Sequence, residues 1–507
     1  MSRYFRLLGL LLLINLCIAG NVIAANGGTL RVALTTMPDS LDMPMASERQ
    51  AQNASWQLYN SLVWMNEKGE VEPALATSWT LSKDQTTYTF KLRKGVTFHN
   101  GEAFTADSVV FSWNRAKQDK MKWSEKWTIA KSVKKIDDFT VEINTGDPSP
   151  LFIRVLADYW AIVPAKYITK TGELGFANHP VGTGPFKFVK WSKGDRIIFE
   201  KNQNYWEKGL PKLDKLVFRP ITESSTRVAA IKTGEIDIVS RLSAEEAATL
   251  KNRKNVIIKT YPIDRVFYIT FNNLTSGKDK PTENKLVRQA MNYAVDVDAI
   301  IAALFNGHAR PSTGYVTPGN LGYDKTLKPF GYDPEKAKKL LAEAGYPKGF
   351  KIGFAAPSGA YTNFDQVCQA IQNYLKEVGI DAELQLMESG KYWNLEAKKE
   401  LPPLFGDSWS ERSGEALPRL QGALGGMKSS YSSWSDAKID DYLKKIETTV
   451  DEGARAKLYV ELQRYMQEDP PFIYLYEPET FEAVNPKVKN YTPRPAEQYY
   501  LKNVEIN

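Results

Sequence analysis

Hydrophobic residues recur along this chain at two spacings, one typical of strands and the other typical of helices. In 86–98, TTYTFKLRKGVTF, the residues Tyr88, Phe90 and Leu92 occupy every second position, which predicts a strand with one buried face. In 333–345, DPEKAKKLLAEAG, an aspartate followed by a proline starts a helical pattern and a glycine ends it. Because segments of both kinds alternate throughout, the sequence predicts a mixed α/β protein.

Two further segments are predicted as helices that end at a glycine. In 227–239, RVAAIKTGEIDIV, Gly234 suits a left-handed C-cap before a short strand. The segment 284–307 keeps a helical pattern of apolar residues up to Gly307. No repeat, low-complexity tract or long linker interrupts the chain, and its 507 residues favour two or three domains rather than one.

The N-terminal segment has the pattern of a secretory signal peptide. Two arginines precede an apolar run that is too short to span a membrane, and small residues follow, which predicts a cleavable signal over 1–25. Cys17 leaves a lipoprotein as the alternative, but the bulky Leu16 before it does not fit the usual lipobox. We therefore expect a periplasmic protein in which Cys368 is the only cysteine, so that no intramolecular disulfide can form.

The charge of the chain does not suggest nucleic-acid binding, and its aromatic content leaves room for ligand contact. The formal net charge of +7 is low for this length, and no block of like charge suggests nucleic-acid binding. The chain has 12 tryptophans and 25 tyrosines, and exported proteins rich in aromatic residues often use some of them for ligand contact.

Motifs of catalysis and metal binding are not found. His99, His179 and His308 are far apart and have no nearby histidine or cysteine, so no pattern of a metal site is present. The glycine spacing in VGTGPF lacks the rest of a dinucleotide fingerprint, and no nucleophile elbow or phosphate-binding loop occurs. We therefore expect no cofactor, no metal and no enzymatic activity.

Seven segments together carry a family pattern. They are PALATSW (73–79), TTYTFKLRKGVTFHNGEAFTADSVVFSWNR (86–115), VGTGPFKFVKW (181–191), NQNYW (202–206), TRVAAIKTGEIDI (226–238), LVRQAMNYAVDVDAII (286–301) and GYDPEKAKKLLAEAGY (331–346). In this order they resemble the peptide/nickel family (family 5, cluster C) of extracytoplasmic solute-binding proteins of ABC importers. The similarity runs over essentially the whole chain after the signal peptide.

This resemblance implies a two-lobed clamshell of three domains, with mixed sheets flanked by helices. Domain I would comprise 26–60, 180–273 and 477–507, domain II would be 61–179, and domain III would be 274–476. A small peptide or peptide-like solute would bind in the cleft between the lobes, and closure about a hinge would bury it. The closed form, expected to be a monomer, would dock on the membrane permease of an ABC importer.

The segment LFGDSWSERSGEAL (404–417) corresponds to a ligand-contacting loop of the family. Dipeptide binders have an aspartate here that anchors the ligand's α-ammonium, but neither alignment of this loop supplies an acid at that position. The resemblance therefore implies a ligand clamp in which Trp409 is a stacking wall and Arg412 meets a carboxylate or carbonyl group. Asp407 and Ser408 of the same loop are further candidates.

The same loop also contains two glutamates, and its SWSERSGEA stretch looks closer to a subgroup with a GW…S/T-G-E-A pattern. Glu411 and Glu415 could form a glycosidase pair, but the arginine between them makes ion pairing the simpler interpretation. Glu415 is predicted to be a structural partner that caps the helix whose apolar positions begin at Leu417.

A second departure from dipeptide binders lies at 355–366, AAPSGAYTNFDQ. Dipeptide binders place an arginine near this point for the ligand carboxylate, whereas this chain has Gly359 and Ala360. With both usual anchors absent, two hypotheses remain. One is a receptor for peptides held mainly by their backbone, and the other is a receptor for a non-peptide solute such as an opine-like conjugate, an oligosaccharide or a metal–chelator complex.

On the opposite lobe, MKWSEKW (121–127) lies where peptide-binding relatives present a tyrosine to the ligand. Trp123 and Trp127 are therefore candidates for ligand contact. The loop MPMASERQ corresponds to the family's cleft floor, which makes Ser47 and Glu48 further candidates.

Overall fold

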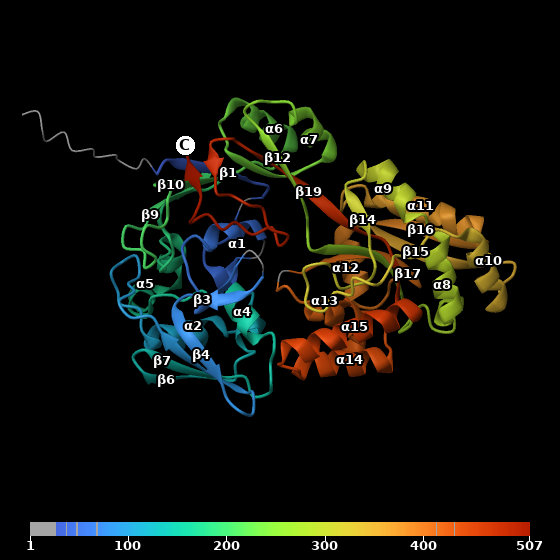
Figure 1. Cartoon of the computed structure of the whole chain (residues 1–507), viewed down its shortest axis with the longest axis horizontal. Helices are drawn as coiled ribbons and strands as arrows, with labels where there is room; N and C mark the ends of the chain where they lie inside the picture. Colours follow the sequence, from blue (N-terminus) through green and yellow to red (C-terminus); the bar gives the residue numbers. More distant parts are fainter. Residues whose placement is uncertain (1–26, 37, 47–48, 67–68, 412, 430) are drawn as a thin grey trace, which may run out of the picture.

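The computed structural model of the protein describes residues 27–507 with the exception of 37, 47–48, 67–68, 412 and 430 (Figure 1). The predicted signal peptide lies outside these residues, as do the site candidates Ser47, Glu48 and Arg412. Within the described part, no helix is long and apolar enough to cross a membrane.

The described elements form two lobes, which Figure 1 shows side by side with β19 running from one to the other. The first lobe contains an eight-stranded mixed sheet. Its strands are, in order, β12 (Ile257–Pro262), β19 (Tyr476–Val484), β11 (Ile238–Leu242), β1 (Thr29–Leu34), β10 (Lys215–Pro220), β9 (Arg196–Lys201) and β8 (Phe186–Ser192), with β14 (Ala309–Pro311) paired to β19.

Residues of β1 alternate between two cores, one on each face of this sheet. Leu30, Val32 and Leu34 pack against one side, and Ala33 packs against the other. The first core includes residues of α5 (Ala165–Asn178), of the segment around α1 (Arg49–Ser55) and of the C-terminal tail, which carries β20 (Val488–Lys489) and β21 (Glu505–Ile506). The second core includes α6 (Ser224–Thr233) and α7 (Ala244–Leu250).

The rest of the first lobe is built on a four-stranded antiparallel sheet. Its strands are, in order, β4 (Ala76–Leu81), β5 (Thr87–Leu92), β7 (Thr140–Asn144) and β6 (Ser132–Asp137). The neighbouring elements are η1 (Met43–Met45), β2 (Val63–Met65), β3 (Val71–Pro73), α2 (Ala106–Ala116), α3 (Ser124–Trp127) and α4 (Phe152–Tyr159). The predicted strand pattern is confirmed, because Tyr88, Phe90 and Leu92 are all buried in this core.

The second lobe surrounds a five-stranded mixed sheet. Its strands are, in order, β16 (Ile380–Glu388), β15 (Phe350–Ser358), β17 (Leu404–Ser410), β13 (Arg265–Phe271) and β18 (Phe472–Tyr474). Its helices are η2 (Pro281–Glu283), α8 (Lys285–Ala294), α9 (Val297–Phe305), α10 (Pro334–Glu343), α11 (Phe364–Glu377), α12 (Ser389–Ala397), α13 (Leu417–Leu424), η3 (Gly426–Lys428), α14 (Ala437–Thr448) and α15 (Glu452–Glu468).

The helix ends expected from the sequence are partly confirmed. Gly234 ends α6 in the left-handed region with φ of 75°. The single helix predicted over 284–307 is wrong, because the structure breaks it into α8 and α9. The Asp296 side chain accepts a hydrogen bond from the Ala299 amide at 2.9 Å and so starts a second helix, which the spacing of apolar residues does not reveal.

The chain crosses between the lobes at two points that lie side by side. β12 of the first sheet continues into β13 of the second sheet, and β18 continues into β19 in the opposite direction. Pro262 pairs with Glu479, and the Ile263 amide donates a hydrogen bond to the Pro478 carbonyl at 3.2 Å. We expect any hinge motion between the lobes to occur at this pair of strands. The exact domain boundaries given above stay a prediction.

Candidate ligand-binding site

An open hollow of about 520 Å³ lies in the second lobe at the end of β17. Its walls are Arg265, Tyr361, Trp393, Asp407, Ser408, Trp409, Ser410 and Tyr431. Three residues predicted from the loop sequence, Asp407, Ser408 and Trp409, are therefore brought together here. The size suits a small solute, since ligand sites typically measure roughly 300–1,000 Å³.

Trp409 is held in place from two sides. Its ring lies over Gly422 of α13, where an added Cβ would come within 2.3 Å of the ring. The Tyr431 ring meets it edge to face at a centroid distance of 5.2 Å. Only a glycine at position 422 permits this packing, so the helix and the end of the strand together fix the aromatic wall.

Asp407 is a buried carboxyl group whose charge is supported by hydrogen bonds. It is 4% exposed and accepts from the Ser408 amide at 2.6 Å and from the hydroxyls of Tyr361 at 3.3 Å and Tyr268 at 3.4 Å. Burial raises its pKa to about 6, although these hydrogen bonds act to lower it. At neutral pH the hollow therefore contains an ionised carboxylate.

A second carboxyl group lies close to Asp407. Glu396 of α12 is fully buried, and its pKa is raised to about 10, first by burial and then by the nearby charge of Asp407. Two carboxylates in one buried site cannot both ionise without a large cost. Glu396 is therefore protonated at neutral pH, and the pair carries a single negative charge.

Arginine side chains lie on the wall of the hollow and in the first lobe. Arg265, at the start of β13, donates from Nη1 to Ser408 Oγ at 2.6 Å. In the first lobe, Arg241 forms a two-pronged pair with Glu497, at 2.7 Å from Nε and 3.0 Å from Nη2. Burial acts to raise the pKa of Glu497, but Arg241, then Arg49 and Arg265, outweigh it and hold the pKa below its ordinary value. Arg241 thus contacts Glu497 directly, and Arg49 and Arg265 stabilise its charge from further away.

The Arg241–Glu497 pair also has an unusual backbone. Both residues have φ of 54°, in the left-handed region that non-glycine residues rarely adopt. Such conformations cost energy and tend to occur at ligand sites, where the surrounding structure imposes them.

A narrower cavity of about 160 Å³ lies between the two lobes near the hinge. The first lobe contributes Asn66, Arg494 and Gln498 among others, and the second lobe contributes Thr317 and Asn320. Polar side chains from both lobes therefore face one another across the cleft.

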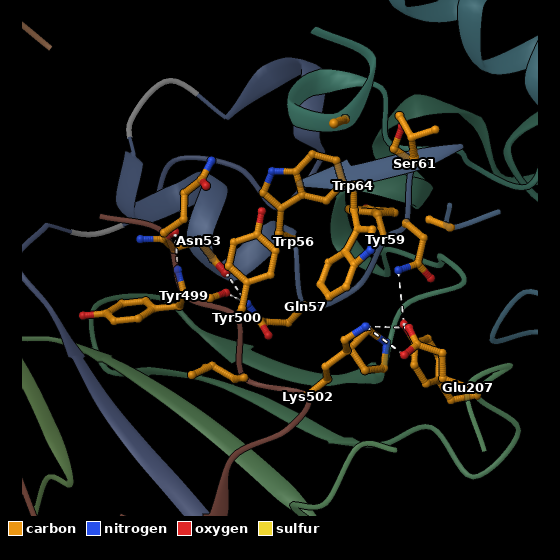
Figure 2. Close-up of a pocket in the computed structure, with 18 of the residues that line it drawn as sticks. Asn53, Trp56, Gln57, Tyr59, Ser61, Trp64, Glu207, Tyr499, Tyr500 and Lys502 are labelled. Atoms are coloured by element: carbon orange, nitrogen blue, oxygen red, sulfur yellow. Dashed lines mark hydrogen bonds and ion pairs between the residues drawn. The ribbon is translucent and has the colours of Figure 1, made fainter. Parts of the chain in front are cut away.

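A third cavity lies inside the first lobe and is shown in Figure 2. Trp56, Trp64 and Tyr500 form aromatic walls, and the Lys502 amine pairs with Glu207 at 2.6 Å at one side. Its volume of about 70 Å³ holds a few water molecules rather than a peptide. This cavity is therefore a poorer candidate for a peptide than the hollow at the end of β17.

The tryptophans expected on the opposite lobe have different environments. Trp123 is half-buried, donates from Nε1 to the Ala46 carbonyl at 2.8 Å and lies against Tyr159, next to the predicted cleft-floor loop. Trp127 is 0% exposed and stacks on Trp160 with ring centroids 4.6 Å apart. We remove Trp127 from the candidate site, because its ring belongs to the core and offers no surface to a solute.

Three other residues discussed from the sequence are structural. Glu415 pairs with Arg455 at 2.6 Å instead of capping α13, whose N-cap is Ala416, so that part of the prediction is wrong. His99 bonds to the carbonyl of Gly184 and the amide of Gly182, and burial lowers its pKa to about 4. Cys368 is buried.

Sequence reasoning missed Arg265, Tyr361, Trp393, Arg241 and Glu497. Tyr361 lies within 355–366, where the sequence analysis noted only the absence of an arginine. The other four carry no local signal, because each meets its neighbours only when segments far apart in the sequence pack within a lobe. Among the described residues, no group of three or more histidine, cysteine or carboxylate side chains is arranged to hold a metal ion.

Comparison with known proteins identifies the family. The family described as "Bacterial extracellular solute-binding proteins, family 5 Middle" matches residues 70–430. The chain belongs to this family. Such proteins are the extracytoplasmic solute receptors of ABC importers, and the relatives that match are binding proteins rather than enzymes.

Several relatives match over most of their length. The glutathione-binding protein GsiB of Escherichia coli O157:H7 is 33% identical over 458 residues, which is 88% of each chain. The structure of HbpA2 from Haemophilus parasuis has a TM-score of 0.87 at 28% identity and covers 95% of this chain and 100% of that one. DppA from Helicobacter pylori in complex with the peptide STSA has a TM-score of 0.76 at 30% identity, with 95% and 98% covered. The two-lobed fold predicted for the chain is thereby confirmed.

Proposed function

We propose that this family 5 protein captures a small peptide that carries at least one carboxylate in addition to its ammonium, with glutathione as the leading candidate. The bound form would deliver the peptide to the permease of an ABC importer. The observation that carries this proposal is the presence of guanidinium groups from both lobes, with Arg265 on the wall of the hollow and Arg241 in the first lobe, both acting on the charge of Glu497. The similarity to glutathione-binding GsiB supports it.

The arginines suit the acidic end of such a solute. A guanidinium presents a planar set of donors that matches a carboxylate, and its charge persists at any physiological pH. Arg265 belongs to the second lobe and Arg241 to the first, so one carboxylate-rich ligand could contact both. Such shared contacts stabilise the closed form.

Asp407 suits the ammonium end. An ammonium group that leaves water needs a carboxylate partner, and Asp407 lines the hollow in ionised form at neutral pH. The rings of Trp409, Trp393 and Tyr361 would cover the apolar parts of the solute. For the remaining ligand contacts we keep the residues proposed from the sequence, namely Arg412, Trp123, Ser47 and Glu48.

A second candidate is an opine-like carboxylate. The structure of AgaA in complex with agropinic acid is 30% identical to this chain, has a TM-score of 0.75 and covers 95% of the chain. The arginine cluster fits this class equally well. A requirement for a free ammonium group on the ligand separates the two candidates, because only the peptide proposal gives Asp407 a partner.

We also propose that the protein is periplasmic, that its signal peptide is removed and that it catalyses no reaction. The relatives are receptors, and no catalytic motif was found in the sequence. The hollow is lined by aromatic rings and charged side chains, which suits the binding of a solute. Catalysis would instead require a nucleophile and a base placed next to the reacting bond.

The test is isothermal titration of the purified protein, stripped of carried-over ligand, with reduced glutathione and with glutathione amidated at both carboxylates. We expect binding of the acid and a loss of at least about tenfold for the diamide, since a hydrogen bond to a charged group contributes about 1.5–3 kcal/mol. Arg265→Gln should weaken binding of the acid by a similar factor. The matched control is Arg464→Gln, an arginine that is 59% exposed on α15.

Equal affinity for acid and diamide would refute the role of the arginines. Binding of N-acetylated glutathione as tightly as glutathione itself would remove the role of Asp407 and favour the opine-like class. If neither glutathione nor related acidic peptides bind the stripped wild-type protein, the proposed substrate class is wrong.

A further inference from the structure

Glu396 is a buried acid that lies next to the hollow at the end of β17. It belongs to α12 and is 0% exposed, and neither of its carboxyl oxygens has a hydrogen-bond donor among the described residues. The charge of Lys399 acts on it, but the Lys399 amine donates to the Ser429 carbonyl instead. Its hydrogen-bonding neighbour is the carboxyl group of Asp407, which lines the hollow.

Two carboxyl groups can form a hydrogen bond with each other only when one of them carries a proton. The Asp407 carboxylate accepts from the Ser408 amide at 2.6 Å. It also accepts from the hydroxyls of Tyr361 and Tyr268, at 3.3 and 3.4 Å. These donors stabilise a negative charge on Asp407, whereas Glu396 has no such donor among the described residues. The proton therefore stays on Glu396, whose hydroxyl donates to Asp407.

The helix α12 is attached to β17 at two positions one turn apart. The Tyr392 hydroxyl donates to the Gly406 carbonyl at 2.7 Å, and Glu396, four residues later, meets Asp407. Residues four apart lie on the same face of a helix. Trp393 of the same helix lines the hollow. One helix therefore places both an aromatic ring of the wall and the proton donor to Asp407.

The other charged and titratable groups that act on the two acids are four tyrosines and two cations. They are Tyr268, Tyr315, Tyr361, Tyr392, Arg265 and Lys399. Burial raises the pKa of all four tyrosines, which therefore stay neutral. Arg265 acts to lower the pKa of Asp407, but burial outweighs it and raises this pKa to about 6. Near pH 6, Asp407 is thus the member of this group that changes its charge.

We propose that protonated Glu396 is a positioning residue of the ligand site, which donates to Asp407 and keeps that carboxylate ionised and oriented for a cationic group of the solute. The proposal rests on the proposed function, in which Asp407 is the partner of an ammonium group. Glu396 is not among the residues that line the hollow, so it acts through Asp407 and not by contact with the solute.

Two substitutions separate the donated hydrogen bond from the acid itself. Glu396→Gln keeps the shape and a donor, because the amide of glutamine can still donate to Asp407. Glu396→Met keeps much of the length and removes the donor. The matched control is Glu482→Gln in the first lobe, where a buried acid accepts from the hydroxyls of Tyr261 at 2.9 Å and Tyr491 at 2.6 Å.

The first test needs no solute and finds the proton. Infrared difference spectra of the ligand-free protein detect the carbonyl stretch of a protonated carboxyl group. At pH 8 we expect this band in the spectrum of wild type minus that of Glu396→Gln. The control difference with Glu482→Gln should show little of it, because the pKa of Glu482 is about 7 and most of that acid is ionised. No band for Glu396→Gln would overturn the proposal, even if the methionine variant does not fold.

The same spectra follow the protonation of Asp407 as the pH is lowered. Subtracting the spectrum of a matched Asp407→Asn protein isolates this group in wild type and in each Glu396 variant. We expect a midpoint near pH 6 in wild type and in Glu396→Gln. In Glu396→Met the midpoint should rise by about one pH unit, because the ionised form has lost one hydrogen bond. Equal midpoints in all three proteins would overturn the proposal.

The second test measures binding of reduced glutathione by titration calorimetry between pH 5 and 7, where its ammonium group is mostly protonated. Affinity should fall as the pH drops through the pKa of Asp407, because a neutral acid no longer attracts the ammonium group. This fall should begin about one pH unit higher in Glu396→Met and stay in place in Glu396→Gln and Glu482→Gln.

A purely structural role for Glu396 would give a different result. The melting temperature of Glu396→Met would then drop while the pH profile of binding stays as in wild type, which would overturn the proposal. If glutathione does not bind wild-type protein at any pH, the proposed solute is wrong. The infrared midpoints then still decide whether Glu396 sets the charge of Asp407.

Discussion

Glu396 and Asp407 form a buried carboxyl pair whose protonation is set by burial. The pKa of Glu396 is raised to about 10, so the folded protein holds a proton on it between roughly pH 5 and 9, where the unfolded chain has released it. Stability falls with rising pH wherever the folded state binds more protons than the unfolded state. As the pH rises through this range, Glu396 therefore lowers the free energy of unfolding by up to about 1.4 kcal/mol for each pH unit.

Glu396→Gln should remove this contribution. We expect the free energy of unfolding, measured with urea between pH 6 and 8, to fall less steeply with pH in the variant than in wild type. The two proteins should become more alike toward pH 5, where the unfolded wild-type chain also begins to bind the proton. Parallel profiles for both proteins would show that Glu396 is ionised in the fold.

At the scale of the element, α13 positions the aromatic wall of the site. Gly422→Ala would place a methyl group 2.3 Å from the Trp409 ring and push the ring toward the hollow. We expect solute affinity to fall about tenfold or more, as is typical of a displaced aromatic contact, and tryptophan fluorescence to change. Titration calorimetry and emission spectra check this.

Gly453→Ala in α15 is the matched control. Its Cβ would make only an ordinary contact, 3.4 Å from Asp451. Because alanine is the better helix former, we expect this variant to be slightly more stable, by up to about 1 kcal/mol, with unchanged affinity. A similar loss of affinity in both variants would show that the packing of Trp409 on Gly422 is not the cause.

At the scale of the whole molecule, Asp264 connects the hinge to the second lobe. Its carboxylate accepts hydrogen bonds from Thr317 at 2.7 Å, Asn320 at 2.9 Å and Arg419 at 2.6 Å. Its backbone amide also donates to the Pro495 carbonyl of the first lobe at 3.0 Å. One residue between β12 and β13 therefore ties the C-terminal tail, a loop and α13 together.

Asp264→Ala would leave the fully buried Arg419 without its charge partner. We expect the free energy of unfolding to fall by about 3–5 kcal/mol, measured with urea at neutral pH. Arg464→Ala removes an exposed partner of the buried Asp324, which Thr326 still contacts through two hydrogen bonds, and should cost about 1 kcal/mol or less. A small effect of Asp264→Ala would mean that water or another acceptor compensates Arg419.

Some parts of the fold and site were predictable because their signals are local. The strand at 87–92 follows from alternation, and the start of α10 follows from Asp333 and Pro334. The break between α8 and α9 was missed because an aspartate cap within an apolar helical pattern adds little to the periodicity. Trp127 was misplaced because the sequence does not tell a core tryptophan from one at a cleft.

The sequence by itself determined the α/β class, the family and the loop that forms one wall of the site, because these depend on short-range patterns and on motifs kept in order. Only the tertiary structure decided which charges meet. Arg241 and Glu497 are 256 positions apart, and Arg154 and Ser413 are 259 apart. Such pairs form only when segments far apart in the sequence pack together, within one lobe or between the two, and the burial that sets their strength exists only in the folded chain.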